Sequence, residues 1–261
     1  MTLILALSCC EGKSKKPMLL IAADRQASSH YTKTETTKIR YLPEKNMDAL
    51  PSIVFAAAGD AYIADEIYDA FDNYLSQHSD ELNDVFNFLN YNRIKLSDIV
   101  GNIYVKYKNR GYKSDVTILL CGCNNQYNQI ILQICNEGLN MIHYNYCIIG
   151  MGSLTGGELL LNELFYSKQD DYDAVVLACL IINLVSKIDL SVGKGIDLVS
   201  CINNKVRVLP EDEFNEAKKR LDNNWSLIKK IWRYHNYNLL IDELKKMREL
   251  IEAIEQKEAN N

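Results

Sequence analysis

The second residue of the chain combines two groups that could form a nucleophile. Thr2 follows the initiator Met1, and its side chain is small enough for methionine aminopeptidases to remove Met1. Removal would leave a free α-amine beside the Thr2 hydroxyl. Because an unperturbed α-amine has a pKa of about 7.7–8.0, it can accept the hydroxyl proton near neutral pH while the oxygen attacks a carbonyl carbon. A Met-Thr start is common, however, so this feature alone is not diagnostic.

Other residues with possible chemical roles follow short apolar segments. Asp24 closes the apolar run 18–23, where an unpaired carboxylate would be costly, so a partner is expected. Lys38 lies in Thr-Lys-Ile, Gly59 ends an alanine-rich run, and Asp189 precedes Gly-Lys-Gly at 193–195. Without further context, Asp24 and Lys38 could form an ordinary surface pair, and Gly59 could be a simple turn glycine.

The elements that must position these residues alternate in blocks along the chain. Segments 3–7, 18–23, 34–41 and 53–58 read as strands, and helical spacing of apolar residues follows around 63–74 and 96–104. Strands are predicted again at 116–123, 127–135 and 144–149, helices at 152–165 and 172–186, and a closing hairpin at 196–208. This order predicts an α+β fold, a four-layer αββα sandwich with helices on both outer faces.

A Rossmann-type alternative would require alternating strand–helix units and a Gly-x-Gly-x-x-Gly motif after a strand, which the sequence lacks. We expect residues 1–209 to form the main domain and residues 210–261 a helical, charged C-terminal extension. Within the extension, the apolar stripe from Leu240 to Ile254 fits either a helix packed on its own domain or a coiled-coil element that docks a partner.

Five motifs, in order, give the sequence a family resemblance. The Thr2-led strand is followed by Ala-Ala-Asp24, Thr-Lys38-Ile, the alanine-rich run to Gly59, Gly-Met-Gly-Ser at 150–153, and finally Asp189 before Gly-Lys-Gly. This succession resembles proteasome β subunits and the related bacterial ring protease across roughly residues 2–209. The resemblance implies the Ntn-hydrolase (N-terminal-nucleophile) version of the αββα sandwich and a threonine peptidase or amidase.

The resemblance also implies a role for each matched residue. Thr2 matches the catalytic threonine, Lys38 the active-site lysine, and Asp24 the acid that orients this lysine. The backbone N–H of Gly59 matches the oxyanion-hole donor, and Asp189 matches the acid near the terminal amine. These roles are physically consistent, because a nearby ammonium lowers the pKa of the Thr2 hydroxyl and amine while Asp24 compensates its charge.

Two positions depart from the family pattern. Active proteasome subunits usually carry serines where this chain has Met151 and Val192, and those serines help to hold the terminal amine and its water. The departure leaves three functions open: threonine hydrolysis through an acyl-enzyme, peptide transfer as in the proteasome-related archaeal connectases, and an inactive scaffold subunit. A cysteine nucleophile at Cys9 or Cys10, paired with His30, is a further alternative with less support.

Bulk properties limit the partners. The net charge of −5 has no cluster of Lys and Arg, which argues against nucleic acid, and no apolar run is long enough to cross a bilayer. Eight cysteines without a Cys-x-x-Cys pair predict reduced thiols in the cytoplasm. No cofactor or metal is expected, although a zinc site at Cys121 and Cys123 is an alternative. The expected partner is a peptide or protein substrate, with either a homo-oligomeric ring or a monomer.

Overall fold

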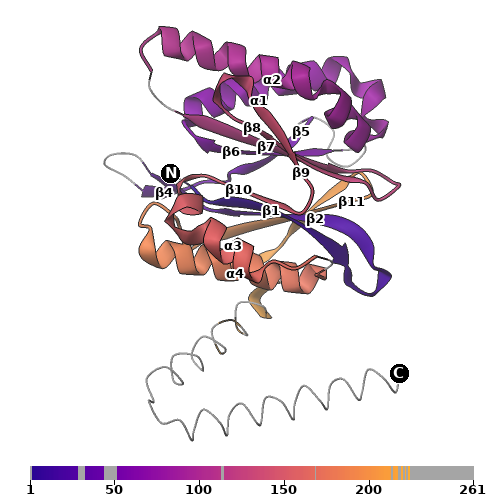
Figure 1. Cartoon of the computed structure of the whole chain (residues 1–261), viewed down its shortest axis with the longest axis vertical. Helices are drawn as coiled ribbons and strands as arrows, with labels where there is room; N and C mark the ends of the chain where they lie inside the picture. The colour runs from indigo at the N-terminus through magenta and orange to yellow at the C-terminus, as the bar shows by residue number, and fades with distance from the viewer. Residues whose placement is uncertain are drawn as a thin grey trace, which may run out of the picture. The chain divides into compact units, whose positions relative to one another are not determined.

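The computed structural model describes residues 2–28, 33–43, 52–112, 115–167, 169–212, 214–216, 219, 221 and 223. One compact unit runs from Met1 to Ala217, and the fold below is that of this unit. It consists of two five-stranded antiparallel sheets, a short two-stranded sheet and four α-helices among the described residues (Figure 1).

The first sheet carries the N-terminal strand at its interior. Its order is β10 (Tyr146–Ile149), β1 (Ile4–Glu11), β2 (Lys16–Asp24), β11 (Ile196–Ile202) and β12 (Lys205–Leu209). The β1–β2 hairpin turns through a short 3-10 segment, Gly12–Ser14. The β11–β12 hairpin turns at Asn203 and Asn204, which both have positive φ, the geometry of a two-residue hairpin with the strands' natural twist.

The second sheet packs on the first. Its order is β5 (Ile39–Leu42), β6 (Ile53–Gly59), β7 (Val116–Cys123), β8 (Gln129–Ile134) and β9 (Asn140–His143). Two short strands, β3 (Gln26–Ser28) and β4 (Lys33–Glu35), pair with each other after β2. The chain therefore passes from the first sheet to the second between Asp24 and Ile39, and this crossing segment contains Lys38.

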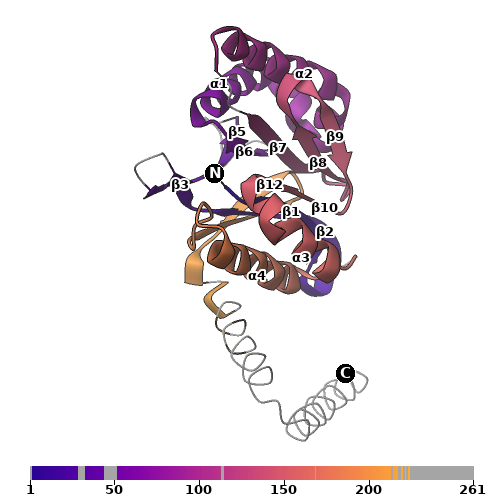
Figure 2. The same cartoon turned by 60° about the vertical axis from the view of Figure 1, so that its left-hand side comes forward.

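Helices cover the outer face of each sheet. Helices α1 (Ala61–Gln77) and α2 (Val85–Asn109) lie on the second sheet, and α3 (Glu158–Leu164) and α4 (Asp171–Ile188) lie on the first (Figures 1 and 2). A π-helical segment, Ser153–Gly157, leads into α3. The predicted αββα sandwich is confirmed.

Two apolar layers hold the sandwich together. Between the sheets, Ile4, Ile21 and Ala23 of the first sheet meet Ile39 and Val54 of the second. Between the second sheet and its helices, a separate cluster includes Phe55, Ile67 and Phe71. The rings of Phe55 and Phe71 pack edge to face. The period-two alternation along β6 sends successive side chains into these two layers, so a single strand supplies both.

The predicted single strand at 34–41 is wrong. The structure divides it into β4 and β5, with Thr36–Lys38 outside both strands. The physical reason is that the two ends pair with different sheets: Glu35 pairs with Gln26, whereas Ile39 pairs with Ala56. The prediction also missed β9, and it began β8 and β10 two residues too early.

Two further predictions concern the C-terminal part. The Leu240–Ile254 stripe lies outside the described residues. The division into domains 1–209 and 210–261 remains a prediction. In the part of the chain that the structure describes, no helix is both long and apolar enough to cross a membrane.

Candidate active site

Thr2 is fixed at the start of β1 by two glycines. Its carbonyl oxygen accepts a hydrogen bond of 3.2 Å from the Gly152 N–H, and its side chain is buried. Gly150 has a φ of +97°, and a Cβ at this position would lie 2.3 Å from the Thr2 carbonyl oxygen. Glycine therefore lets the 150–152 turn lie directly against Thr2, which explains part of the Gly-Met-Gly-Ser motif.

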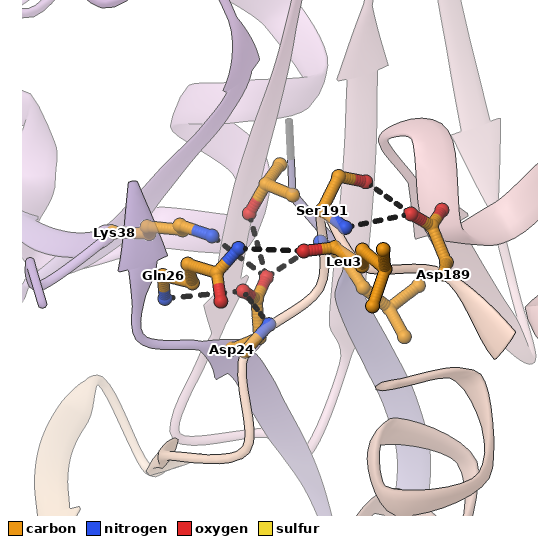
Figure 3. Close-up of polar contacts among 9 residues, drawn as sticks. Leu3, Asp24, Gln26, Lys38, Asp189 and Ser191 are labelled. Carbon is orange, nitrogen blue, oxygen red and sulfur yellow. Dashed lines mark hydrogen bonds and ion pairs between the residues drawn. The ribbon is translucent and has the colours of Figure 1, made fainter. Parts of the chain in front are cut away.

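The Asp24 carboxylate is the hydrogen-bonding centre of the site (Figure 3). Its Oδ1 atom accepts bonds from the Thr2 hydroxyl (2.9 Å), the Leu3 N–H (2.7 Å) and the Lys38 ammonium (2.7 Å). Its Oδ2 atom accepts bonds from the N–H groups of Gln26 (3.1 Å) and Gly193 (2.8 Å). These donors satisfy a carboxylate that is 0% exposed, which is how a buried charge becomes tolerable.

Lys38 reaches the same carboxylate from the segment that leads into the second sheet. Its side chain is 8% exposed, and its Nζ lies 2.7 Å from Asp24 Oδ1. Burial lowers the Lys38 pKa, and the attraction of Asp24 and, more weakly, of Asp197 opposes this shift only in part. A buried lysine with a lowered pKa exchanges its proton more readily than an exposed one, which suits a residue that assists a nearby hydroxyl.

The structure thus brings three of the predicted site residues together. Thr2 Oγ1 and Lys38 Nζ both lie within hydrogen-bond distance of one oxygen, Asp24 Oδ1. The expectation gave Asp24 the task of orienting the lysine, but here it also orients the threonine hydroxyl directly. A hydroxyl, an ammonium and a carboxylate in this arrangement are the groups that a nucleophile and its proton-transfer partner require.

Asp189 lies at the end of α4, on the loop that continues to Gly193. Its carboxylate accepts hydrogen bonds from the Ser191 N–H (2.8 Å), the Ser191 hydroxyl and the Thr155 hydroxyl (2.9 Å). Desolvation would raise the Asp189 pKa, but the hydrogen bonds from Ser191 and Thr155 lower it. The carboxylate therefore stays ionised, as stabilisation of an amine requires.

The two departures from the family pattern change the surroundings of this acid. Met151 is 43% exposed, whereas Val192 is buried and packs near Gly152, where a Cβ would lie 2.9 Å from Val192 Cγ2. The neighbouring serines have their own partners, because the Ser153 hydroxyl donates to the Gly150 carbonyl and the Ser191 hydroxyl donates to Asp189.

Gly59 is not among the hydrogen-bond partners of Thr2, Asp24 or Lys38 in the described part of the chain. Its φ is +119°, and a Cβ would lie 2.0 Å from the Asp115 carbonyl oxygen, so close packing at the end of β6 already requires glycine. The pairing of Ile39 with Ala56 nevertheless places Lys38 and Gly59 at the same end of the second sheet. The oxyanion-hole role of Gly59 stays a prediction.

Several supporting groups were missed by the sequence analysis. The backbone N–H groups of Leu3, Gln26 and Gly193 donate to Asp24, and Thr155 donates to Asp189. Backbone donors leave almost no trace in a sequence. The one available signal was the glycine at 193, where a Cβ would lie 2.5 Å from Gln26 Cβ.

The cysteines lie apart from this group. All eight belong to the described residues and are free thiols. Cys121 and Cys123 are buried between the sheets, and burial raises the pKa of both. Cys9 is buried too, with its pKa raised chiefly by burial, and His30 lies outside the described residues. Within the described part of the chain, no group of three or more His, Cys, Asp or Glu residues could hold a metal ion.

A family model described as "Proteasome subunit" matches residues 9–201, a span that includes Asp24, Lys38, Gly59 and Asp189 and begins after Thr2. No curated protein matches the chain.

Solved structures with the same fold include Anbu proteins, named as ancestral β-subunits. Anbu from Yersinia bercovieri has a TM-score of 0.69 at 13% identity, over 89% of this chain and 97% of that one. Anbu from Hyphomicrobium sp. strain MC1 has a TM-score of 0.65 at 18% identity, over 89% and 97%. Its Gly-1 mutant has a TM-score of 0.62 at 17% identity, over 90% and 97%.

At these identities the solved structures show a common fold, and the family model supplies the relationship. Since that model spans residues 9–201 of 261, this chain belongs to the proteasome subunit family.

Proposed function

We propose that the protein is an N-terminal threonine hydrolase that cleaves amide bonds of a peptide or protein substrate. The observation that carries the proposal is the shared oxygen: Asp24 Oδ1 binds both the Thr2 hydroxyl and the Lys38 ammonium inside the sandwich. Membership in the proteasome subunit family supports the same reading. In this proposal Asp189 stabilises the Thr2 α-amine, and the backbone N–H of Gly59 binds the oxyanion.

The proposed reaction proceeds through an acyl-enzyme. After removal of Met1, the α-amine of Thr2 accepts the hydroxyl proton as Thr2 Oγ1 forms a bond to the substrate carbonyl carbon. The Gly59 N–H stabilises the resulting oxyanion. The C–N bond then breaks, the leaving nitrogen takes the proton from the amine, and water hydrolyses the ester on Thr2. The ammonium of Lys38 stabilises the ionised states of Thr2 throughout.

The test is covalent labelling of the mature protein. A peptide epoxyketone or β-lactone should add its mass to the peptide that begins with Thr2, as read by mass spectrometry. Thr2→Ala should abolish the adduct, and Lys38→Met should slow its formation at least about a hundredfold, as for loss of one preorganised charge. Lys106→Met is the matched control, because that lysine is exposed on α2 and should not affect labelling.

Two results would count against the hydrolase. N-terminal sequencing of protein purified from cells should find Thr2 as the first residue, so retention of Met1 contradicts the proposal. A mature protein that begins with Thr2 and still forms no adduct would instead support the inactive scaffold subunit.

Peptide transfer is the second candidate, and the side chains at 151 and 192 favour it. With Met151 and Val192 in place of serines, the site has fewer hydroxyls to hold a hydrolytic water. An acyl-enzyme without a positioned water survives long enough for an incoming amine to intercept it. A competing amine peptide decides the issue, because ligated product should dominate for a transferase and hydrolysed product for a hydrolase.

Location and assembly belong to the same proposal. The eight free cysteines support a reducing compartment, which we take to be the cytoplasm. The family resemblance implies ring assembly, whereas a monomer is the alternative if the C-terminal extension covers the face used for assembly.

A further inference from the structure

We propose that the side chain of Gln26 is a positioning residue that fixes the loop carrying Asp189 relative to Asp24. The inference rests on the proposed function for its catalytic meaning, but the mechanical link is a property of the structure itself. Gln26 is the first residue of β3 and follows Asp24 by two positions. Its backbone N–H donates to Asp24 Oδ2 at 3.1 Å, so the start of β3 is fixed to the buried carboxylate.

The Gln26 side chain extends this connection to the loop at 189–193. Its Nε2 donates to the Leu190 carbonyl oxygen at 2.9 Å (Figure 3). Leu190 is the residue directly after Asp189, and its own side chain is 78% exposed. The loop is therefore held at this point through its backbone carbonyl, and the Leu190 side chain contributes little.

The rest of the loop is bonded at both ends. The Asp189 N–H donates to the Val185 carbonyl in α4 (2.8 Å), and the Val192 N–H donates to the Asp189 carbonyl (3.1 Å). At the far end, the Gly193 N–H donates to Asp24 Oδ2 (2.8 Å). Gln26 thus adds a third attachment point between these two anchors, on the side of the loop where Asp189 begins.

Close packing makes the link stiff. A Cβ on Gly193 would lie 2.5 Å from Gln26 Cβ and 2.9 Å from the Gln26 nitrogen, so the loop rests directly on the Gln26 backbone. Gln26 therefore contacts both the Asp24 carboxylate and the loop that begins at Asp189. A shift of this loop would change the distance between Asp24, which binds the Thr2 hydroxyl, and Asp189, which is proposed to face the Thr2 amine.

Hydrogen exchange tests the mechanical part without requiring activity. Gln26→Met keeps the length of the side chain but removes the Nε2 donor. Gln26→Asn keeps an amide group, but on a side chain that is one methylene shorter. In both full-length variants, the backbone amide hydrogens of residues 190–193 should exchange with solvent about tenfold faster than in the wild type, as expected for loss of one hydrogen bond. Leu190→Ala is the matched control and should stay within about twofold, since it keeps the carbonyl.

Labelling kinetics test the catalytic part. In Gln26→Met the maximal rate of adduct formation on Thr2 should fall about tenfold, while the concentration giving half-maximal rate stays within about twofold. A purely structural role would instead lower the melting temperature and leave the maximal rate of the folded protein unchanged. Asn at this position provides the same test if the methionine variant does not fold.

The outcomes separate this inference from the proposed function. Unchanged exchange at 190–193 in both Gln26 variants overturns it, as does faster exchange with an unaltered labelling rate. If the wild type itself forms no adduct, the proposed function fails, and faster exchange in the Gln26 variants but not in Leu190→Ala still establishes that Gln26 positions the loop.

Discussion

The Asp24 carboxylate accepts hydrogen bonds from four separate parts of the chain: Thr2 and Leu3 at the N-terminus, Gln26 at the start of β3, Lys38 just before β5, and Gly193 in the loop before β11. Asp24→Asn keeps its shape but removes the charge and turns one acceptor oxygen into a donor. Lys38 would then be a buried cation without its partner. We expect a loss of about 3–5 kcal/mol in the free energy of unfolding, measured by urea denaturation, together with loss of labelling at Thr2.

The control for Asp24→Asn is an ion pair on the surface. Lys108 and Glu137 are 56% exposed each and lie 2.8 Å apart. Glu137→Gln should leave the free energy of unfolding close to that of the wild type, because solvent screens an exposed ion pair. If Asp24→Asn costs no more than this control, the buried pair does not organise the site.

The lowered pKa of Lys38 predicts how stability depends on pH. The unfolded chain has a lysine pKa of about 10.4, so between the folded pKa and this value the unfolded state binds a proton that the folded state does not. The contribution of Lys38 to the free energy of unfolding is therefore smallest below its folded pKa and increases as pH rises from that pKa to the unfolded value. The increase is about 1.4 kcal/mol for each unit by which the folded pKa is lowered.

The measurement compares the wild type with Lys38→Met by urea denaturation between about pH 7 and about pH 10.4. The difference in unfolding free energy should move in favour of the wild type as pH rises. Groups with raised pKa values, such as Tyr41 at about 12, act in the opposite direction but are present in both proteins and cancel. A difference that moves the other way would mean that Asp24 raises the Lys38 pKa.

At the residue level, the sequence could identify side chains but not backbone donors. Asp24 stood out because it closes an apolar strand, and the family resemblance added Lys38. Gln26 and Thr155 were missed because their partners, the Leu190 carbonyl and the Asp189 carboxylate, lie far away in sequence. Such contacts depend on how loops meet in space, which no local pattern encodes.

At the level of elements, the turn at Gly150 connects β10 to Thr2. Gly150→Ala would place a Cβ 2.3 Å from the Thr2 carbonyl oxygen, in a backbone conformation with φ +97°. The turn must then move away from Thr2. We expect labelling at Thr2 to fall at least about tenfold, because small misplacements of reacting groups are costly, and stability to fall by more than the conformational strain of about 1–3 kcal/mol.

Gly111→Ala separates strain from contact. Gly111 also has a positive φ, +87°, but a Cβ there meets nothing within 4 Å. This variant should show only the conformational cost and normal labelling. Unfolding free energies are measured by urea denaturation and Thr2 labelling by mass spectrometry. If Gly150→Ala and Gly111→Ala change both quantities equally, Gly150 has no steric role at Thr2.

The elements that the sequence predicted well are those whose pairing agrees with local pattern. The run 116–123 is β7 with the predicted bounds, because this central strand is buried on both faces and reads as continuous apolar residues. Segment 140–143 was missed since β9 is a short edge strand with exposed residues, including Met141. Edge strands are defined by a neighbour on one side, and composition reveals this poorly.

At the level of the whole molecule, the end of the folded core is testable. The compact unit extends to Ala217 and includes Phe214, which is 1% exposed. We predict that limited proteolysis leaves a core fragment that retains Phe214, because removing a buried phenylalanine costs about 3–5 kcal/mol. Mass spectrometry of the fragment gives its end. A stable core that ends at Leu209 would support the boundary predicted from the sequence.

The site also depends on the whole molecule for its existence. Asp24 ends β2 of the first sheet and Thr2 lies just before β1 of the same sheet, whereas Lys38 immediately precedes the edge strand of the second. A nascent chain that has emerged only as far as the first hairpin lacks the ammonium, and a half-collapsed intermediate lacks the shielded environment around the carboxylate. Gly193, whose N–H donates to the Asp24 carboxylate, follows Asp24 by 169 positions, so the carboxylate gains its full set of donors only after most of the chain has been synthesised.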